Sequence, residues 1–159
     1  AYGNVYVASC AYGAKDVQTV NAIKEAESYD GVSIVIAYSP CIEHGYELSE
    51  SIGQMELAVQ SGYWPLYRFD PRRFETGEKP LKIDSKPPTI SLTDYLMTED
   101  RFAMVQRRDP ERFEKLVAEA EYNLRKRHAV YEKMAELCLP TEEEGESEGN
   151  DEGGDKTAS

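Results

Sequence analysis

A strand–helix–strand pattern over residues 4–38 constrains the fold of this chain more than any other feature. Residues 4–8 favour β-branched and aromatic types, and Asp30-Gly31 separates a helical segment from the near-continuous apolar run at 32–38. Four apolar residues recur at helical spacing before that turn: Val17, Val20, Ile23 and Ala26. Two strands joined by a helix pair in parallel with a right-handed crossover. We therefore predict an α/β fold in which residues 32–38 are covered on both faces.

The following residues predict a second helix, a short strand and an extended arm. The helix spans 48–59 and has one apolar face, formed by Leu48, Ile52, Met55 and Val59. Residues 63–70 predict an aromatic strand, and Pro65 within it indicates a place at or near a sheet edge, because proline cannot donate to a central ladder. From Pro71 to about Pro88 the chain is rich in Pro, Lys, Arg and Gly, which predicts an extended arm with a brief strand at 80–85.

Helical patterning resumes near Thr93, and its strongest signal begins at Asp109-Pro110-Glu111. A capping aspartate, a proline at the first helical position and an acid in the first turn all favour a helix start there. A seam of apolar residues follows with four-three spacing, interrupted by Arg127: Phe113, Val117, Ala120, Leu124, Tyr131, Met134 and Cys138. This spacing predicts an amphipathic helix of about seven turns that packs through one seam.

We divide the chain into four segments. Residues 1–70 hold the βαβ-type unit, 71–92 the extended arm, 93–140 the C-terminal helices and 141–159 an acidic tail. The tail has 8 acids and 1 base, and with almost no apolar surface to bury we expect it to be disordered, as a solubilising extension rather than an interaction arm. Because two or three strands do not form a stable doubly wound sheet alone, we expect a partial parallel sheet with flanking helices, at the C-terminal end of a larger polypeptide.

Composition argues against several classes of function. Most of the net charge of −12 comes from the tail, and no basic patch with interleaved aromatic residues appears, so we do not expect nucleic-acid binding. No apolar run approaches the roughly 20 residues needed to cross a bilayer, so we do not expect a membrane protein. The three cysteines are odd in number and widely spaced, which fits a reducing compartment, with the cytoplasm as the default.

Cys41 is the main candidate for chemistry. It follows the carboxyl end of the predicted strand 32–38, where open α/β sheets place ligands, and Pro40 restricts the turn before it. It is either a metal or cluster ligand, a thiolate nucleophile, or an inert buried cysteine; spacing alone favours the last, because Cys-x-x-His with His44 falls short of a metal site. We expect Cys10 and Cys138 to be core residues, and His44 and His128 to be structural or exposed.

Several stretches together resemble the C-terminal end of the pyruvate:ferredoxin (flavodoxin) oxidoreductases. The motifs are "EAESYDG", "AYSPCIEHGY" and "SGYWPLYR", and the resemblance runs in order from about Asn4 to about Leu137. It implies that residues 1–70 are the last part of a domain that binds thiamine diphosphate and Mg²⁺. It further implies an enzyme that oxidatively decarboxylates pyruvate with coenzyme A and passes electrons through iron–sulfur clusters to ferredoxin or flavodoxin.

The resemblance also implies a role for Cys41. By its match to the "YSPC" motif, Cys41 would be the fourth ligand of the [4Fe–4S] cluster nearest the thiamine diphosphate. The family's Gly-Asp-Gly motif and its other cluster ligands are absent from these 159 residues, so we do not expect this segment alone to hold a cluster or turn over pyruvate. A homodimer in the cytoplasm or an organelle is the implied assembly. The alternatives are a related 2-oxo acid oxidoreductase and a non-catalytic α/β interaction module.

Overall fold

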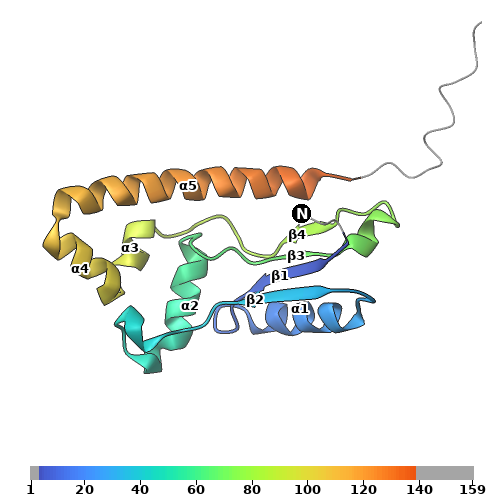
Figure 1. Ribbon diagram of the computed structural model, residues 1–159, viewed down its shortest axis with the longest axis horizontal. Helices are drawn as coiled ribbons and strands as arrows, with labels where there is room; N and C mark the ends of the chain where they lie inside the picture. The colour runs from blue at the N-terminus through green and yellow to red at the C-terminus, as the bar shows by residue number, and fades with distance from the viewer. Residues whose placement is uncertain (1–3, 139–159) are drawn as a thin grey trace, which may run out of the picture.

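The computed structural model describes residues 4–138 as a small sheet flanked by helices (Figure 1). The strands are β1 (Tyr6–Cys10), β2 (Ser33–Ala37), β3 (Tyr67–Phe69) and β4 (Leu81–Ile83). The helices are α1 (Asp16–Ser28), α2 (Ser51–Gln60), α3 (Leu92–Leu96), α4 (Asp100–Arg108) and α5 (Pro110–Glu136). Short 3₁₀ turns lie at Ile42–His44, Leu48–Glu50 and Pro71–Phe74. The predicted acidic tail, 141–159, lies outside the described residues.

The sheet confirms the α/β prediction. Its strand order is β2-β1-β3-β4, and β1 pairs with β2 in parallel through the α1 crossover. The other two pairings, β1 with β3 and β3 with β4, are antiparallel. The brief strand expected at 80–85 is β4, so part of the predicted arm belongs to the sheet.

The strand predicted at or near a sheet edge, 63–70, lies near an edge but not at it, because β3 is next to the edge strand β4. β3 lies between β1 and β4 and pairs with both. Pro65 does not prevent this, because the paired residues begin only at Tyr67, beyond the proline. Pro65 even serves the sheet, since its carbonyl accepts a hydrogen bond of 2.8 Å from the Ser9 hydroxyl on β1.

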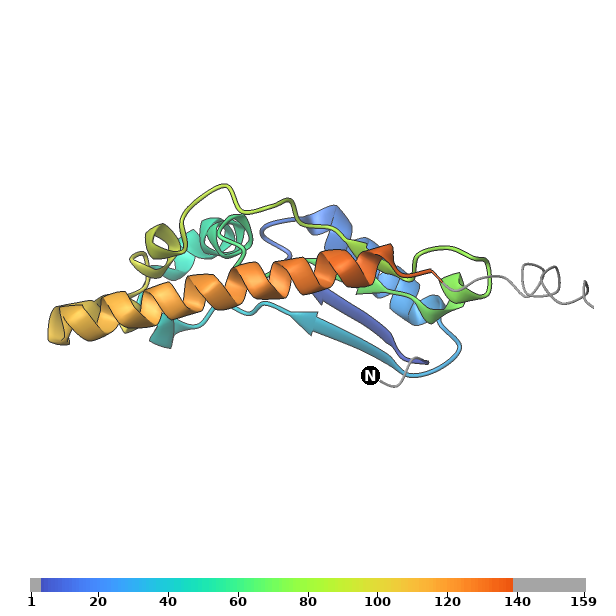
Figure 2. The ribbon, with the colours of Figure 1, turned by 90° about the horizontal axis from the view of Figure 1, so that it is seen from above.

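Helices cover the two faces of the sheet. On one face, Tyr6 and Ala8 of β1 form a buried cluster with Ala22 of α1. On the other, α5 runs along the molecule, and its Tyr131 meets Tyr67 of β3 with ring centroids 5.4 Å apart. Figures 1 and 2 show α1 and α5 on opposite sides of the strands. Among residues 4–138, no helix has the length and apolar character needed to cross a membrane.

The predicted first helix is confirmed as α1, but it meets the sheet mainly through residues outside its apolar stripe. The residues of α1 that face the sheet are Gln18, Thr19 and Ala22, whereas Val17, Val20 and Ile23 are 64%, 46% and 53% exposed. The small Ala22 allows a close approach to the strands, and Gln18 donates a hydrogen bond of 3.1 Å to the Ser9 carbonyl. Of the four apolar residues at helical spacing, Ala26 packs against the cluster of Tyr6, Ala8 and Ala22, whereas the other three are exposed.

The predicted burial of residues 32–38 on both faces is also wrong for this chain. β2 is an edge strand, and Ile34, Val35 and Ile36 are 47%, 36% and 42% exposed. Figure 2 shows why: α5 runs along the β3 and β4 side of the sheet and leaves β2 outside the region that it covers. The predicted apolar face of the second helix is only partly buried, because Met55 is buried but Ile52 is 62% exposed.

The long C-terminal helix is confirmed. Asp109 accepts a hydrogen bond of 3.0 Å from the Arg112 backbone N–H, as expected of the cap, and Pro110 is the first helical residue. Phe113 is buried, and four further seam residues lie in partly buried positions: Val117, Ala120, Leu124 and Tyr131. The seam stops short of its predicted end, since Cys138 is exposed rather than in the core.

Candidate site around Cys41

Cys41 lies four residues beyond β2, at the carboxyl end of the parallel pair. The backbone before it is anchored, because the Tyr38 N–H donates a hydrogen bond of 2.9 Å to the Cys10 carbonyl. Cys41 itself is exposed, so the prediction of an inert buried cysteine does not describe it. Within the described part of the chain, its thiol makes no hydrogen bond.

A short turn carries the chain away from Cys41. Residues Ile42–His44 form a 3₁₀ turn that Gly45 ends with a left-handed backbone, φ 76°. Glycine suits this position twice over: an L side chain rarely adopts such a φ, and a Cβ there would collide with the Cβ of Asp100. The Gly45 carbonyl also accepts a hydrogen bond of 3.2 Å from the Asp100 N–H. The turn is thereby seated on the first residue of α4.

A buried carboxylate, Glu99, lies beneath this turn. Its Oε1 accepts hydrogen bonds from the Tyr95 hydroxyl at 3.0 Å, from Gln54 Nε2 at 3.0 Å and from the Tyr38 hydroxyl at 3.4 Å. Its Oε2 accepts from Arg101 Nε at 2.5 Å. The Glu99 side chain is fully buried, and the structure compensates its desolvation with one cation and three neutral donors. We call these five residues the Glu99 network.

The network reaches the segments on both sides of Cys41. Tyr38 precedes it by three residues, and its hydroxyl also lies 3.0 Å from the Tyr95 hydroxyl. His44 follows it by three residues, with Nδ1 buried and 3.8 Å from Glu99 Oε1. Nothing in the described residues donates to or accepts from that Nδ1. The prediction that His44 is structural fits this position.

Burial and the neighbouring carboxylate shift the ionisation of the network. Burial raises the pKa of Tyr38 and of Tyr95 above the usual value for tyrosine, so both stay neutral hydroxyl donors. Burial works to lower the pKa of Arg101, but the hydrogen bond and charge of Glu99 outweigh it, and the pKa lies above its usual value. Arg101 therefore remains a cation, and the Glu99–Arg101 pair contributes no net charge when Glu99 is ionised.

The other two cysteines form no disulfide with Cys41. Cys10 is buried at the end of β1, as predicted, and burial raises the pKa of its thiol. The Cys138 sulfur lies 2.8 Å from the carbonyl of Gly77, between the 3₁₀ turn at Pro71–Phe74 and β4, and Cys138 is exposed. Neither joins Cys41, and residues 4–138 hold no cluster of three or more cysteine, histidine or acidic side chains suited to a metal ion.

These observations test whether Cys41 suits a cluster ligand. An iron–sulfur cluster takes four thiolates, so a chain with three cysteines, of which Cys10 is buried, cannot complete a site by itself. One thiol at a fixed, exposed position, with no competing hydrogen bond, suits a single ligand whose companions come from elsewhere in the protein. The predicted role is thus compatible with the geometry, and it stays a prediction.

A second buried ionic cluster lies on the α1 side of the sheet. Arg68 of β3 makes a two-point contact with Asp84, at 2.7 Å and 3.0 Å, and also pairs with Glu25 of α1. Burial works to raise the pKa of Asp84, but the hydrogen bonds from Arg68 and Gln18 outweigh it, and the pKa lies below its usual value. This cluster ties α1 to the strand β3 and to the residue that follows β4, which is a structural role.

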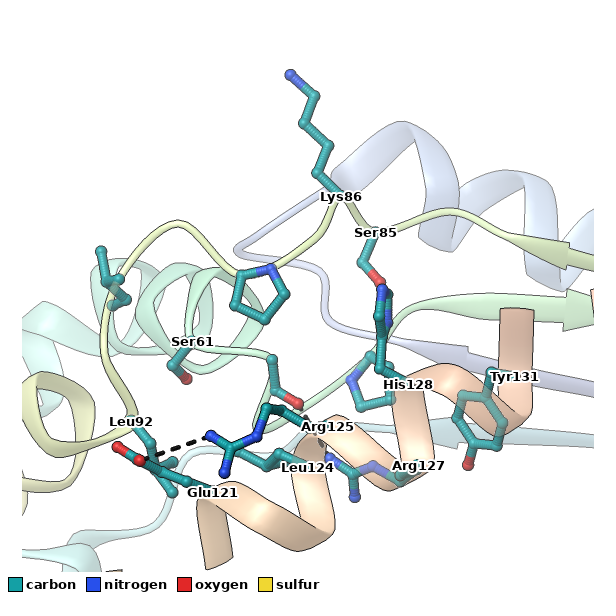
Figure 3. Close-up of a pocket in the computed structure, with 14 residues that line it drawn as sticks. Ser61, Ser85, Lys86, Leu92, Glu121, Leu124, Arg125, Arg127, His128 and Tyr131 are labelled. Atoms are coloured by element: carbon teal, nitrogen blue, oxygen red, sulfur yellow. Dashed lines mark hydrogen bonds and ion pairs between the residues drawn. The ribbon is translucent and has the colours of Figure 1, made fainter. Parts of the chain in front are cut away.

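A cavity of about 250 Å³ lies between α5 and the end of the arm (Figure 3). Arg127, the one polar residue of the predicted seam, donates hydrogen bonds of 3.0 Å and 2.8 Å to the Gly62 and Tyr63 carbonyls. Arg125 pairs with Glu121 at its rim, 3.8 Å away. His128, predicted to be structural or exposed, lies 3.3 Å from Glu132. The charged side chains at the cavity thus have partners within the chain, and Arg127 ties α5 to the residues that follow α2.

Sequence reasoning missed Glu99. It lies in "LMTEDRF", a polar stretch between two short helices, where an acid normally caps a helix or faces solvent. Its partners Tyr38 and Gln54 are 61 and 45 residues away along the chain. The only local signal is the four-residue spacing of Tyr95 and Glu99, which lets the two side chains meet.

Comparison with known proteins supplies the context of this site. No protein-family model matches the chain. The pyruvate-flavodoxin oxidoreductase of Rhodospirillum rubrum is 47% identical over 145 residues, which is 91% of this chain and 12% of that protein. The pyruvate:ferredoxin oxidoreductase of Moorella thermoacetica is 46% identical over 136 residues, 86% of this chain and 12% of that protein. The mitochondrial pyruvate dehydrogenase [NADP(+)] of Euglena gracilis is 40% identical over 86% of this chain and 8% of that protein.

The similarity thus covers nearly all of this chain but little of each relative. The chain spans about one eighth of the length of the two bacterial enzymes that it matches. The resemblance noted in the sequence is confirmed. This chain is homologous to a segment of the pyruvate-flavodoxin and pyruvate:ferredoxin oxidoreductases.

Proposed function

We propose that this chain is the C-terminal segment of an enzyme that oxidatively decarboxylates pyruvate to acetyl-coenzyme A. The observation that carries the proposal is 46–48% identity to three such oxidoreductases over 84–91% of the chain. In this proposal residues 1–70 complete a domain that binds thiamine diphosphate and Mg²⁺. Residues 71–92 and 93–140 provide an arm and helices that pack against neighbouring domains or a second subunit of a homodimer.

The proposed contribution of the chain to chemistry is one cluster ligand, Cys41. Pro40 restricts the backbone before it, the turn at Ile42–His44 directs the chain away behind it, and Gly45 seats that turn on α4. When bound, a [4Fe–4S] cluster accepts and passes on single electrons. The task of these residues is to hold the sulfur of Cys41 at a fixed point. The apolar, exposed surface of β2 beside it would exclude water once other parts of the enzyme cover it.

The names of the relatives bear on substrate and electron acceptor. Pyruvate appears in every name reported above, which favours pyruvate over another 2-oxo acid. The acceptors differ: flavodoxin, ferredoxin and NADP⁺. Because segments with 40–47% identity to this chain occur with all three, we propose flavodoxin or ferredoxin as the partner and do not assign the choice to these residues.

The test is an activity assay on the full-length protein that carries this chain, purified without oxygen. With pyruvate, coenzyme A and thiamine diphosphate it should release CO₂ and reduce flavodoxin or ferredoxin. Reaction with 2-oxoglutarate in place of pyruvate would favour the related enzyme, and no reaction with either would reject the proposal.

The cysteine assignment has a separate test, iron analysis of two variants. Cys41→Ala should lose iron and sulfide equivalent to one four-iron cluster, because a cluster with three protein ligands is readily lost. Cys138→Ala, also an exposed cysteine, is the matched control and should keep its full iron content. Equal iron in both variants would remove Cys41 from the ligand set.

A further inference from the structure

We infer that Glu99 is a positioning residue for the Cys41 thiol, fixing the backbone on both sides of it. The inference rests on the proposed role of Cys41 as a cluster ligand. The observation behind it is that two segments, one on either side of Cys41, converge on the same fully buried carboxylate. Tyr38 reaches Glu99 from the end of β2, and His44 lies against it from the turn that follows Cys41.

The Glu99 side chain is held from several elements at once. Gln54 belongs to α2, Tyr95 to α3 and Arg101 to α4, and each donates to it. With four donors on two oxygens, the carboxylate has little freedom to rotate or shift. Because Glu99 is held by α2, α3 and α4, it can in turn restrict the movement of the 38–45 segment that it contacts.

The backbone of Glu99 is held as firmly as its side chain. Its carbonyl accepts hydrogen bonds from the Phe102 and Ala103 N–H groups at 3.0 Å and 3.1 Å, which makes it the start of α4. The backbone N–H of the next residue, Asp100, donates a hydrogen bond to the Gly45 carbonyl. Two adjacent residues, Glu99 and Asp100, therefore support the 38–45 segment through a side chain and through the backbone.

This support matters for a ligand more than for a surface loop. A metal or cluster ligand has to stay within about 0.5 Å of its working geometry, and residues behind the ligand set that precision. Cys41 is exposed and makes no hydrogen bond within residues 4–138, so its own contacts do not fix it. Its position depends on the residues that flank it, and those depend on Glu99.

The test compares three variants of the full-length enzyme by low-temperature EPR of the reduced clusters. Cys41→Ser identifies the signal of the cluster that Cys41 ligates. Glu99→Gln keeps the size of the side chain but offers an amide N–H₂ where the network needs an acceptor. Glu119→Gln, the same change at an exposed position on α5, is the matched control.

We expect Glu99→Gln to retain iron and to shift or broaden only the signal that Cys41→Ser alters, while Glu119→Gln leaves every signal unchanged. If Cys41→Ser alters a signal and Glu99→Gln leaves it unchanged, the inference is wrong while the cluster role stands. If Cys41→Ser alters no signal, the proposed ligand role and this inference both fall.

A milder variant covers the case in which Glu99→Gln does not fold. Tyr38→Phe removes one hydroxyl, whose bond to Glu99 is the longest in the network at 3.4 Å. It should shift or broaden the signal that Cys41→Ser alters and leave the other signals unchanged. An unchanged signal in folded Tyr38→Phe would then overturn the inference.

Discussion

The Arg68 cluster should be among the largest single contributions to stability in this chain. Arg68 is 8% exposed, and its partner Asp84 has a side chain only 5% exposed. Arg68→Met keeps most of the side-chain length but leaves the Asp84 carboxylate buried with Gln18 as its remaining side-chain donor. Removing one partner of a buried ion pair costs about 3–5 kcal/mol. Losing the ion pair with Glu25 adds less to this cost, because the Glu25 side chain is 29% exposed and water can solvate it.

The measurement is amide hydrogen exchange of the β3 and β4 residues in the full-length protein that carries this chain, read by mass spectrometry, which reports the free energy of unfolding of this segment. Arg68→Met should lower the free energy of unfolding by about 3–5 kcal/mol. The matched control is Arg125→Met, which breaks an exposed pair with Glu121 and should cost about 0–1 kcal/mol.

A second change separates the buried charge from lost packing. Asp84→Asn in the Arg68→Met background replaces the stranded carboxylate with a neutral amide, so the double variant should be more stable than Arg68→Met alone. A loss for Arg68→Met no larger than that for Arg125→Met would refute the reasoning. So would a double variant that loses the sum of the two single changes.

Two further predictions concern the turn after Cys41 and the dependence on pH. Gly45→Ala should lower the free energy of unfolding by at least about 1–2 kcal/mol, because Gly45 has a left-handed backbone, and the clash with Asp100 adds to this loss. Gly53→Ala is the control: Gly53 lies in open space within α2, so alanine there should stabilise the protein by about 0.5–1 kcal/mol. Equal thermal melting temperatures for the two variants would contradict this prediction. The pKa of Asp84 is lower in the folded chain than its unfolded value of about 3.9, so the stability that ionised Asp84 contributes is present above about pH 4 and is lost as pH falls through the folded pKa. Acid unfolding of Asp84→Asn should lack this loss of stability. An acid unfolding profile identical to that of wild type would contradict the prediction.

Local patterns predicted the elements that local chemistry decides. The βαβ unit and the start of α5 at Pro110 depend on turn, capping and periodicity signals within a few residues, and both are confirmed. The burial of those elements was less predictable. The stripe with Val17 and Val20 is the most apolar face of α1, yet the helix meets the sheet through Gln18 and Ala22, because these allow close packing and a hydrogen bond.

The site was predictable only in part, for a related reason. Cys41 stands out through its motif and its place after a strand. Glu99 does not, because what makes it special is burial, and its burial is created by Tyr38 and Gln54 from distant parts of the chain. Periodicity and composition report local preference, and they contain no information on which polar residue the tertiary fold will enclose.

The most direct test of the central claim is the EPR spectrum of the reduced full-length enzyme with Cys41→Ser, compared with wild type and with Cys138→Ser. If Cys41 is a cluster ligand, one iron–sulfur signal should vanish or change shape in Cys41→Ser alone, with the remaining signals intact. Identical spectra for all three proteins would contradict the account.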